Sequence, residues 1–335
     1  MRIVYVGPFP PPYGGVTVKN KTLYNALQEH LCIERIDTSV ETTSRLGLLR
    51  KVFRLALAND AKIVLAVSDG SRRLLVRFFH MVSRKRMNRL VLIIMGGSFA
   101  KKLENDYGYT KLLSSCGHIF VETQGMKESL LRYGLSNVTI YPNCRVKPEI
   151  SLVPKVNDGR LSCIFFSQIS YEKGADVVLE AAKMLPDVDF TFYGVIKDDY
   201  SSQFHPLVSE SENVSYMGVF SGDSEAVYNV LNSYDVLILP TRWKTEGVPG
   251  VLVESKISAI PAIVSDVGFN SEIITSSLDG IVLDTISPSE LVRGIELYNN
   301  DRALLYRHKK AALVSSEKYL LENNIQNIRS ILKDG

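Results

Sequence analysis

Two glutamates and two glycines lie close together in residues 240–254. Glu246 lies in a polar stretch after an apolar run, and Glu254 lies one turn inside a segment with helical spacing. Gly247 and Gly250 leave backbone N–H groups exposed where that helix begins, which suits an anion. Each carboxylate can accept hydrogen bonds from vicinal hydroxyls of a ribose or a hexose. We therefore expect the glutamates to contact different parts of one elongated ligand. Taken singly, each could instead be a helix-dipole partner or a solvated charge.

Two further loops place glycine or lysine at the start of a helix. Gly14 and Gly15, in the loop Pro8–Val16, precede a helical segment, so backbone amides there can approach a phosphate without a Cβ in the way. Lys173 and Gly174 follow a strand-like run, and a lysine so placed can reach a diphosphate. The alternatives are a tight strand-to-helix turn for the glycines and a solvated loop charge for the lysine.

The elements that must position these residues alternate along the chain. In the first half the expected strands are Arg2–Val6, Lys62–Ala66, Leu90–Ile94, His118–Val121 and Val138–Tyr141, and the expected helices are Val18–Gln28, Leu46–Ala58, Arg72–Ser83 and Met126–Tyr133. In the second half the expected strands are Leu161–Phe166, Phe190–Tyr193, Val214–Met217, Val236–Leu239 and Ala262–Val264. The helices expected there are Val177–Met184, Ser224–Leu231, Val251–Ser258, Pro288–Tyr298 and the stretch Arg302–Lys333. Continuously apolar strands that alternate with helices predict parallel sheets covered by helices.

The length and one irregular segment divide the chain. At 335 residues, two domains are expected. Val146–Gly159 carries prolines and charges without a period, and we interpret it as a linker. The prediction is an α/β protein with two doubly wound domains, 1–150 and 151–315, and a crevice between them. Residues 316–335 are expected to form a helix that packs back toward the first domain. In such sheets ligands bind at the carboxyl ends of the strands.

Charge is divided unevenly between the halves. Residues 1–150 hold 23 Lys and Arg against 11 Asp and Glu, a net +12, and the remainder carries −9. The first half is therefore expected to face something anionic. Arg72–Arg89 is basic with apolar residues interleaved, and two interpretations remain open: a helix with one core face, or a patch for an anionic membrane surface. A nucleic-acid partner is not expected, because no nucleic-acid-binding motif accompanies the charge.

The sequence predicts a cytoplasmic protein without a metal site. No apolar run approaches the ~20 residues that a spanning helix needs, and the N-terminus does not resemble a signal peptide. The four cysteines form no CxxC pair or ligand cluster, and we expect them to be structural or incidental. Asp187 and Asp189 resemble a DxD metal motif, but they follow Pro186 as turn residues do. The lone histidines are expected to be core or surface residues.

In this order and spacing, the pieces resemble the retaining, GT-B-fold glycosyltransferases of family 4, the glycosyl transferases group 1 type. The resemblance is strongest over Leu161–Asp284, which holds the Glu172–Gly174 turn and the motif from Glu246 to Glu254. Ile260–Gly268 is similar to the family's G-x-P-V-V-x-x-x-x-G strand. The first domain matches more loosely, through its Gly14-Gly15 loop and through Val138–Asn143, which resembles the family's v-x-x-i-P-N ending.

The resemblance implies a GT-B fold, with two Rossmann-like domains facing a central cleft. It implies transfer of a sugar from a UDP- or GDP-type nucleotide sugar to a saccharide or lipid-linked saccharide, with retention and without metal or cofactor. Surface polysaccharide biosynthesis, at the inner face of the membrane, is the expected setting.

The resemblance also assigns roles to residues. Glu246 would hold the donor sugar, Glu254 the ribose and Lys173 the diphosphate. The expected catalytic residues are Glu246, Lys173 and Gly15, and the expected acceptor-side residues are Gly97 and Ser98. The expected donor-binding residues are Gly14, Gly15, Gln168, Lys173, Val219, Arg242, Gly247, Val248, Pro249, Gly250, Val251, Leu252 and Glu254.

Two positions depart from the family pattern. Gln168 stands where the family usually has Arg, and Met95 stands where it often has His. Three explanations are open: Lys173 and backbone dipoles suffice, Arg242 or Lys244 compensates, or activity is weak. The alternative function is a catalytically impaired nucleotide-sugar-binding subunit. A nicotinamide-dependent oxidoreductase ranks lower, because the sequence has no dinucleotide fingerprint.

Overall fold

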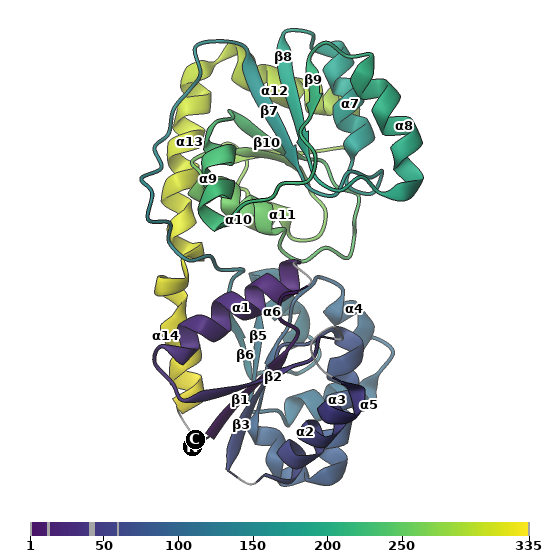
Figure 1. The fold of residues 1–335 in the computed structure, drawn as a ribbon, viewed down its shortest axis with the longest axis vertical. Coiled ribbons are helices and arrows are strands. Elements are labelled where there is room, and N and C mark those ends of the chain that lie inside the picture. The colour runs from purple at the N-terminus through teal and green to yellow at the C-terminus, as the bar shows by residue number, and fades with distance from the viewer. Residues whose placement is uncertain (1, 12–13, 40–43, 59, 334–335) are drawn as a thin grey trace. The chain divides into compact units, whose positions relative to one another are not determined.

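The computed structural model describes residues 2–11, 14–39, 44–58 and 60–333. The chain divides into unit 1, which comprises Met1–Val146 and Tyr319–Gly335, and unit 2, which comprises Lys147–Lys318. These limits lie close to residues 150 and 315, where the sequence places them. Each unit is a six-stranded parallel sheet with helices on both faces, which is the expected α/β doubly wound class (Figure 1).

Unit 1 has the strand order β2-β1-β3-β4-β5-β6. Its strands are β1 (Arg2–Gly7), β2 (Ile33–Asp37), β3 (Ala61–Leu65), β4 (Leu90–Ile93), β5 (His118–Val121) and β6 (Val138–Ile140). Its helices are α1 (Gly15–Gln28), α2 (Arg45–Leu57), α3 (Asp69–Val82), α4 (Phe99–Leu103), α5 (Tyr107–Ser114), α6 (Gln124–Leu131) and α14 (Leu321–Lys333), with the 3-10 helix η1 (Arg84–Arg89).

The C-terminal helix α14 contributes to the core of unit 1. Its buried residues Ile325, Ile328 and Leu332 join Leu27 of α1 and Phe120 of β5 in one hydrophobic cluster. The apolar positions of α14 recur every three or four residues, which places them on one helix face. Burying that apolar face stabilises unit 1. It also packs the C-terminal helix against strands from the first half of the sequence.

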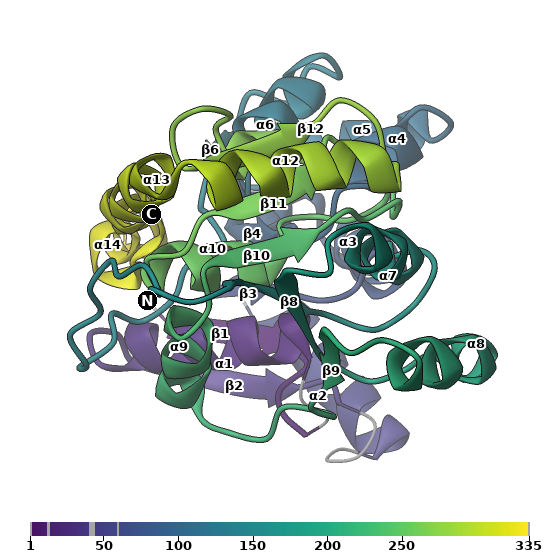
Figure 2. The ribbon, with the colours of Figure 1, turned by 90° about the horizontal axis from the view of Figure 1, so that it is seen from above.

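Unit 2 has the strand order β12-β11-β10-β7-β8-β9. Its strands are β7 (Leu161–Phe166), β8 (Val188–Tyr193), β9 (Val214–Tyr216), β10 (Val236–Leu239), β11 (Ala262–Ser265) and β12 (Gly280–Leu283). Its helices are α7 (Ala175–Met184), α8 (Asp198–Ser209), α9 (Ser224–Asn232), α10 (Gly250–Ile257), α11 (Asn270–Ile273), α12 (Pro288–Asn300) and α13 (Arg302–Ser316). Helix α7 packs against α12, and α10 packs against α9 and α13, so both faces of the sheet are covered (Figure 2).

Each sheet has one point where the strand order reverses. In unit 2 the chain runs from β7 to β8 and β9 on one side, and then returns to β10 on the other side of β7. In unit 1 the corresponding pair is β1 and β3. The loops that follow the two strands of such a pair diverge over opposite faces of the sheet and leave a crevice at its carboxyl edge. A ligand site in unit 2 is therefore expected at the β7–β10 edge.

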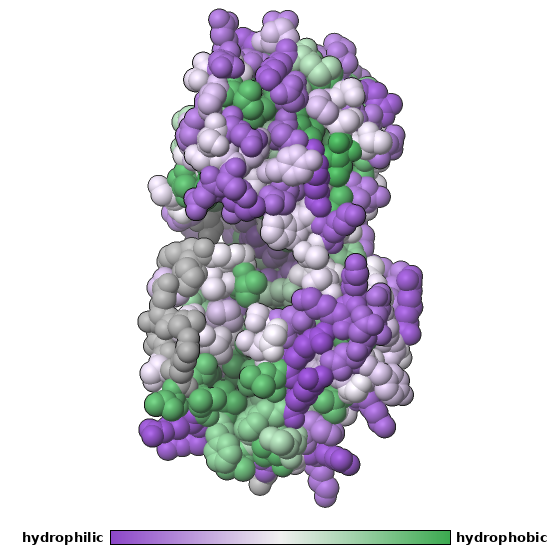
Figure 3. Space-filling view, turned by 90° about the vertical axis from the view of Figure 1, so that its right-hand side faces the viewer, coloured by the Kyte–Doolittle hydropathy of each residue, from purple (hydrophilic) through white to green (hydrophobic). Residues whose placement is uncertain are grey.

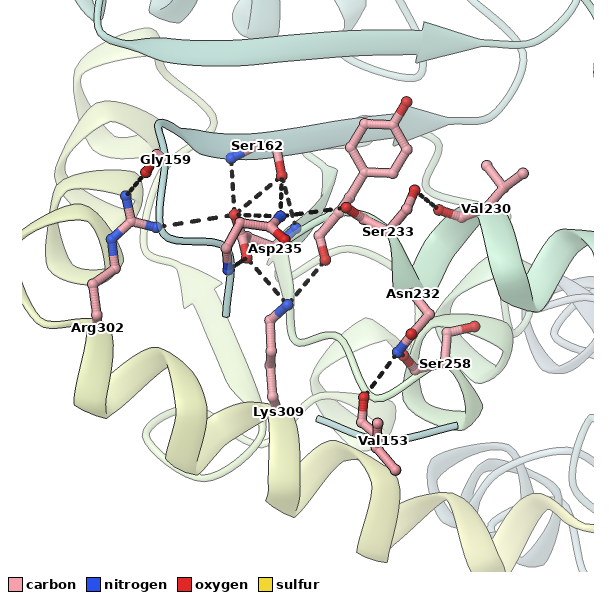
Figure 4. Close-up of polar contacts among 12 residues, drawn as sticks. Val153, Gly159, Ser162, Val230, Asn232, Ser233, Asp235, Ser258, Arg302 and Lys309 are labelled. Carbon is pink, nitrogen blue, oxygen red and sulfur yellow. Dashed lines mark hydrogen bonds and ion pairs between the residues drawn. The ribbon is translucent and has the colours of Figure 1, made fainter. Parts of the chain in front are cut away.

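A buried polar network secures the opposite, amino-terminal edge of the unit 2 sheet (Figure 4). Asp235 directly precedes β10. Its carboxylate accepts two hydrogen bonds from Ser162, at the start of β7: one from the Ser162 backbone N at 3.1 Å and one from the Ser162 Oγ at 3.0 Å. Lys309 of α13 lies 3.2 Å from the same carboxylate and donates to the carbonyl of Tyr234 at 3.0 Å. The side chains of Asp235 and Lys309 are 0% and 1% exposed. Burial lowers the pKa of Lys309, and Asp235 opposes this effect by favouring the ammonium. The network ties two strands to α13.

Replacing Asp235 by Ala is expected to destabilise unit 2 strongly. The variant leaves the Lys309 ammonium buried without its carboxylate, and breaking one partner of such a pair costs about 3–5 kcal/mol in free energy of unfolding. The change would be measured on the unit 2 transition in urea. The double variant Asp235→Ala, Lys309→Met should recover much of the loss.

The matched control is Asp189→Ala. Asp189 forms a half-exposed ion pair with Arg160 at 3.2 Å, and exposed pairs contribute only about 0.2–1 kcal/mol. If Asp235→Ala changed stability no more than Asp189→Ala, the structural role assigned to the buried network would be wrong.

Candidate active site

Three loops meet at the carboxyl edge of the unit 2 sheet, after β7, β10 and β11. The backbone N–H of Arg242 donates to the carbonyl of Glu172 at 2.7 Å, which joins the β10 loop to the β7 loop. The hydroxyl of Thr241 lies 3.2 Å from the same carbonyl. Ser265, at the end of β11, donates to the carbonyl of Thr241 at 2.6 Å. The buried Thr241 therefore connects all three loops, a role that its position in the sequence did not indicate.

Two glycines allow these loops to approach one another closely. Gly174 has φ +79°, and a Cβ there would lie 2.2 Å from the carbonyl oxygen of Pro240. Gly268 has φ +66°, and a Cβ there would lie 2.9 Å from the carbonyl oxygen of Glu246. Both the left-handed backbone and the lack of space exclude a larger residue at either position. The glycines thus set the positions of the loop segments that carry Lys173 and Glu246.

Lys173 and Glu246 form an ion pair, although 73 positions separate them in the sequence. Lys173 Nζ donates to Glu246 Oε1, and the hydroxyl of Thr241 donates to Glu246 Oε2 at 3.3 Å. The side chains of Lys173 and Glu246 are only 14% and 15% exposed. Lys173 Nζ also lies 5.7 Å from the ring centroid of Trp243, within the range of a cation–π contact. One cation and one carboxylate, both predicted to act on the donor, therefore lie together at the β7–β10 edge.

Helix α10 begins beside this pair. Gly250 and Val251 occupy its first turn, where amides point out of the helix and favour an anion. Glu254, half-buried, lies one turn further along. Gly247 is partly exposed and Val248 is buried in the loop before the helix. The first turn of α10 is therefore a candidate anion site, and its role in donor binding stays a prediction.

Two members of the predicted cradle cannot donate to a phosphate. Pro249 has no N–H group. The amide of Leu252 already donates to the carbonyl of Pro249 at 3.1 Å, and its side chain is fully buried. The prediction that the amides from Val248 to Leu252 act together was too broad, and Pro249 and Leu252 have supporting roles.

Arg242 contacts the β7 loop and the start of α7. Its guanidinium pairs with the carboxylate of Asp176, in the first turn of α7, through two hydrogen bonds of 2.7 and 2.9 Å. It also donates to the carbonyl of Tyr171 at 2.8 Å and lies 4.2 Å from the centroid of that ring. Asp176 raises the pKa of Arg242 further. Asp176 and Tyr171 thus hold the guanidinium in this structure, and the role of Arg242 as a cation for the donor stays a prediction.

Another lysine at this edge has partners of its own. Lys197 donates to Glu172 Oε1 at 2.9 Å and pairs with Asp199 at 3.0 Å. The hydrogen bond from Lys197 lowers the pKa of Glu172 to about 2. Lys173 is thus the cation that the structure places against Glu246, and Lys197 belongs to a separate pair.

Gln168 and Val219 lie at the carboxyl edge of the same sheet. Gln168 is exposed just beyond β7, and Val219, at the bend after β9, is 60% exposed. The rings of Phe166, Tyr193 and Phe220 cluster at this edge: Phe166 lies 5.5 Å from Tyr193 and 5.6 Å from Phe220, between ring centroids. The sequence analysis missed these aromatics, although Phe166 and Tyr193 are the last residues of adjacent strands.

The predicted residues of unit 1 lie at the carboxyl edge of its own sheet. Gly14 and Gly15 are exposed where α1 begins, and among the described atoms none lies within 4 Å of a Cβ built on Gly15. Pro12 and Tyr13 of the same loop are outside the described residues. Gly97 and Ser98 are partly exposed between β4 and α4. These two loops follow β1 and β4 of the unit 1 sheet.

Other predictions for unit 1 can be placed from the packing. Met95 packs against the core of unit 1. A buried ion pair that the sequence analysis missed joins Lys19 of α1 to Glu122, just after β5. It fixes the position of α1 over the sheet, and therefore that of Gly14 and Gly15 at the start of this helix.

The basic stretch Arg72–Arg89 is only partly a surface. Arg72 is buried, pairs with Asp69 at 2.8 Å and lies 4.5 Å from the ring centroid of Phe99. Arg73 and Arg77 pair with Asp106 at 3.0 and 2.7 Å. Carboxylates within unit 1 thus pair with the arginines in the first half of the stretch, and of the two interpretations left open the membrane patch stays a prediction.

Within the described residues, no three His, Cys, Asp or Glu side chains gather closely enough to hold a metal ion. Asp189 of the DxD-like sequence pairs with Arg160, and His308 forms a hydrogen bond of 2.8 Å with Tyr298 in the core. Of the helices described, none is long and apolar enough to cross a membrane.

The chain has two Rossmann-like units. At the strand-order reversal of unit 2 lie a cation, two carboxylates and a helix N-terminus. These are the features of a GT-B glycosyltransferase. The family model of the glycosyl transferases group 1 matches residues 146–314, about half of the chain. The chain belongs to this family.

Comparison with known proteins agrees with this assignment. A 41.2 kDa protein in the cps region of Klebsiella pneumoniae is 25% identical over 181 residues, which cover 53% of this chain and 48% of that protein. The Escherichia coli UDP-Gal:alpha-D-GlcNAc-diphosphoundecaprenol alpha-1,3-galactosyltransferase is 26% identical over 76 residues, 23% of this chain and 19% of that enzyme. The chain spans about half the length of the first curated relatives that it matches.

The fold also matches a solved structure over its whole length. The crystal structure of Anabaena HepE (Alr3699) in complex with UDP has a TM-score of 0.76 at 14% identity, and the match covers all of both chains. At that identity the likeness concerns the fold, and it establishes GT-B as the architecture of this chain.

Proposed function

We propose that this protein transfers a sugar from a nucleoside-diphosphate sugar to a saccharide acceptor. The observation that carries the proposal is the Lys173–Glu246 pair at the β7–β10 edge, beside the first turn of α10. A nucleoside-diphosphate sugar has a diphosphate between two polyhydroxylated rings. The site offers a cation and helix amides for the diphosphate. Glu246 lies on one side of them for one ring, and Glu254, one turn into α10, lies on the other side for the second ring.

Donor binding requires the Lys173–Glu246 pair to open. The ammonium of Lys173 would exchange the Glu246 carboxylate for a diphosphate oxygen, forming a charge-assisted hydrogen bond. Glu246 would then accept hydrogen bonds from donor sugar hydroxyls, with Oε2 still held by Thr241. Charge would develop on the diphosphate as the glycosidic bond breaks, and preorganised donors such as Lys173 and the α10 amides would stabilise it without a metal ion.

The finer assignments rest on resemblance and relatives. Retention at the anomeric carbon and membership of family 4 are what the resemblance of the sequence motifs to that family implies. A UDP-type donor is supported by the HepE complex with UDP, and a GDP-type donor remains within the proposal. The exposed Val219 and the rings of Phe166 and Phe220 offer an apolar surface for the base.

The acceptor we propose is a saccharide, in lipid-linked form, handled by unit 1. The support is the name of the E. coli relative, which acts on a diphosphoundecaprenol-linked sugar, and the cps region that encodes the Klebsiella relative. Gly97 and Ser98 are the residues we assign to this side, whereas Gly14 and Gly15 keep the donor-side roles that the resemblance implies. An anionic membrane surface fits the exposed Arg84 and Lys85 of the stretch Arg72–Arg89.

A second function, a nucleotide-sugar-binding subunit with impaired catalysis, is favoured by specific observations. Gln168 supplies no cation, Met95 packs against the core of unit 1, and Arg242 is held by Asp176. With these features the protein would still bind the donor, but the rate of sugar transfer would be low.

Binding of donors to Glu254→Ala tests the proposed donor site. Removing the carboxylate should weaken binding of the preferred nucleoside diphosphate about ten- to a hundred-fold, the range expected for hydrogen bonds to a charged group. Thermal-shift titration with UDP, GDP and their sugars would identify the ligand and measure the loss, because a ligand that binds the folded state raises the unfolding temperature. Glu296→Ala, which removes an exposed glutamate from α12, is the matched control. Equal affinities in both variants would contradict the assignment of Glu254.

A further inference from the structure

Helix α2 exposes a row of large apolar side chains. Leu46, Leu49, Phe53 and Leu57 are 71%, 66%, 53% and 51% exposed. They are three or four positions apart, so they form one stripe along the helix, which we call the α2 stripe. The residues that anchor α2 to unit 1 lie on another face and are buried: Val52, Leu55 and Ala56. The apolar stripe is therefore additional to the face that folding requires.

The side chains beside the α2 stripe are basic. Arg50, Lys51 and Arg54 are exposed, and none of them forms an ion pair with a described carboxylate. Residues 42–59 contain no Asp or Glu. This contrasts with Arg73 and Arg77 of α3, whose charge Asp106 neutralises. The uncompensated positive charge of this part of unit 1 is thus concentrated next to its apolar stripe.

The surface continues from α2 onto the end of α3 and onto η1. The side chain of Arg86 donates to the carbonyl of Ala56, which holds η1 against the end of α2. Arg84 and Lys85 of η1 are exposed, and Met81 of α3 is 77% exposed. Figure 3 shows apolar side chains gathered into one area on the face of unit 1 that carries α2, with hydrophilic side chains beside it.

We propose that the α2 stripe and its basic flank dock unit 1 onto an anionic lipid bilayer. The stripe would enter the boundary between headgroups and acyl chains, and Arg50, Lys51 and Arg54 would contact the lipid phosphates. An apolar face with adjacent Lys and Arg is the composition of helices that lie in the membrane interface. Each basic residue near an anionic surface adds to the affinity, and added salt weakens it.

A second copy of the chain fits this surface less well. A symmetric dimer joins the same patch from both subunits. Such a contact would bring Arg50, Lys51 and Arg54 near their own copies, with no carboxylate in residues 42–59 to offset the repulsion. An anionic bilayer supplies the opposite charge. Membrane docking would bring unit 1 to a lipid-linked acceptor, which lies at the membrane surface. Only this link to the acceptor rests on the proposed function.

Flotation of the full chain with lipid vesicles tests the proposal. The chain should float with vesicles that contain phosphatidylglycerol, float far less with phosphatidylcholine alone, and dissociate as salt is raised. Arg50→Gln, Lys51→Gln, Arg54→Gln should lower the vesicle partition coefficient by about five-fold for each charge removed. Leu49→Ser with Phe53→Ser should abolish binding at moderate salt, because the inserted area is lost.

Matched controls separate the stripe from exposed apolar residues in general. Leu297 of α12 and Val314 of α13 are 50% and 72% exposed, and Leu297→Ser with Val314→Ser should float like wild type. Circular dichroism of each variant checks the fold. The charge variant keeps the proposal testable if the serine variant does not fold, because its substitutions are at exposed positions.

Three results would overturn the proposal: equal binding to neutral and anionic vesicles, no binding to either, or unchanged binding by both sets of α2 variants. A dimer in solution that the serine variant converts to monomer would also overturn it, in favour of self-association. Donor affinity, measured without lipid by thermal shift, reports on unit 2 separately. Failure of the docking proposal therefore leaves the proposed transferase function intact, and the reverse also holds.

Discussion

Replacing Lys173 by Met should lower kcat for sugar transfer by about 10²- to 10³-fold, the usual cost of removing one preorganised charge-stabilising donor. Lys173 is the cation that the structure places against Glu246, while Arg242 is held by Asp176 and Lys197 by Glu172. Affinity for the nucleoside diphosphate should fall as well, because the ammonium is expected to contact the diphosphate in both donor and product. Initial rates and calorimetric titration with the nucleoside diphosphate would measure the two effects.

Lys197→Met is the control for this variant. It removes a lysine from the same edge of the unit 2 sheet, but one that pairs with Glu172 and Asp199. The account expects nearly wild-type rates. A comparable loss of activity in Lys197→Met and Lys173→Met would mean that general loss of positive charge, rather than a specific contact, explains the result.

Replacing Glu246 by Gln should lower kcat by roughly 10²-fold, because a misplaced donor sugar no longer presents its anomeric carbon correctly. The affinity for the nucleoside diphosphate alone should not fall. In wild type the Glu246 carboxylate competes with the diphosphate for Lys173, and the amide of Gln does not carry the competing charge. Lys173→Met and Glu246→Gln are therefore expected to share a loss of rate and to differ in diphosphate affinity.

The control for the second variant is Glu172→Gln, which neutralises a carboxylate in the β7 loop next to Lys173 in sequence. Its partner is Lys197, and its side chain is not assigned to the donor. A Glu246→Gln variant that turns over like Glu172→Gln would remove Glu246 from the mechanism. A Glu246→Gln variant that loses diphosphate affinity would show that the pair does not open as proposed.

Much of the fold was predictable because the central strands are buried on both faces. The runs Leu161–Phe166 and Val236–Leu239 were predicted with the bounds that the structure gives. The missed strands lie at sheet edges: β2 alternates buried isoleucines with the exposed Glu34 and Arg35, and β12 has only four residues. β2 has no continuous apolar run, and the apolar run of β12, residues 281–283, is only three residues long. Helix α8 was missed because it is polar and contains Pro206.

The candidate site was predictable residue by residue but not pair by pair. Lys173, Glu246 and Glu254 were identified from local features, namely a glycine turn and a helix start. Their mutual arrangement depends on β7 lying next to β10, a long-range pairing that local sequence does not encode. For the same reason the ion pair of Arg242 with Asp176 was not predicted: it forms between the β10 loop and the first turn of α7, which are far apart in sequence. Thr241 was missed because it is an unremarkable residue in sequence, and its contacts are all tertiary.

The most direct test of the central claim is release of free nucleoside diphosphate from a panel of UDP- and GDP-sugars, with membrane lipid extract as acceptor. The account predicts acceptor-dependent release from at least one donor by wild type, and a loss of about 10²-fold in Glu246→Gln. If the protein bound a nucleotide sugar but released no diphosphate from any donor, the transferase assignment would be contradicted and the non-catalytic subunit favoured. Release that Glu246→Gln left unchanged would equally contradict the account.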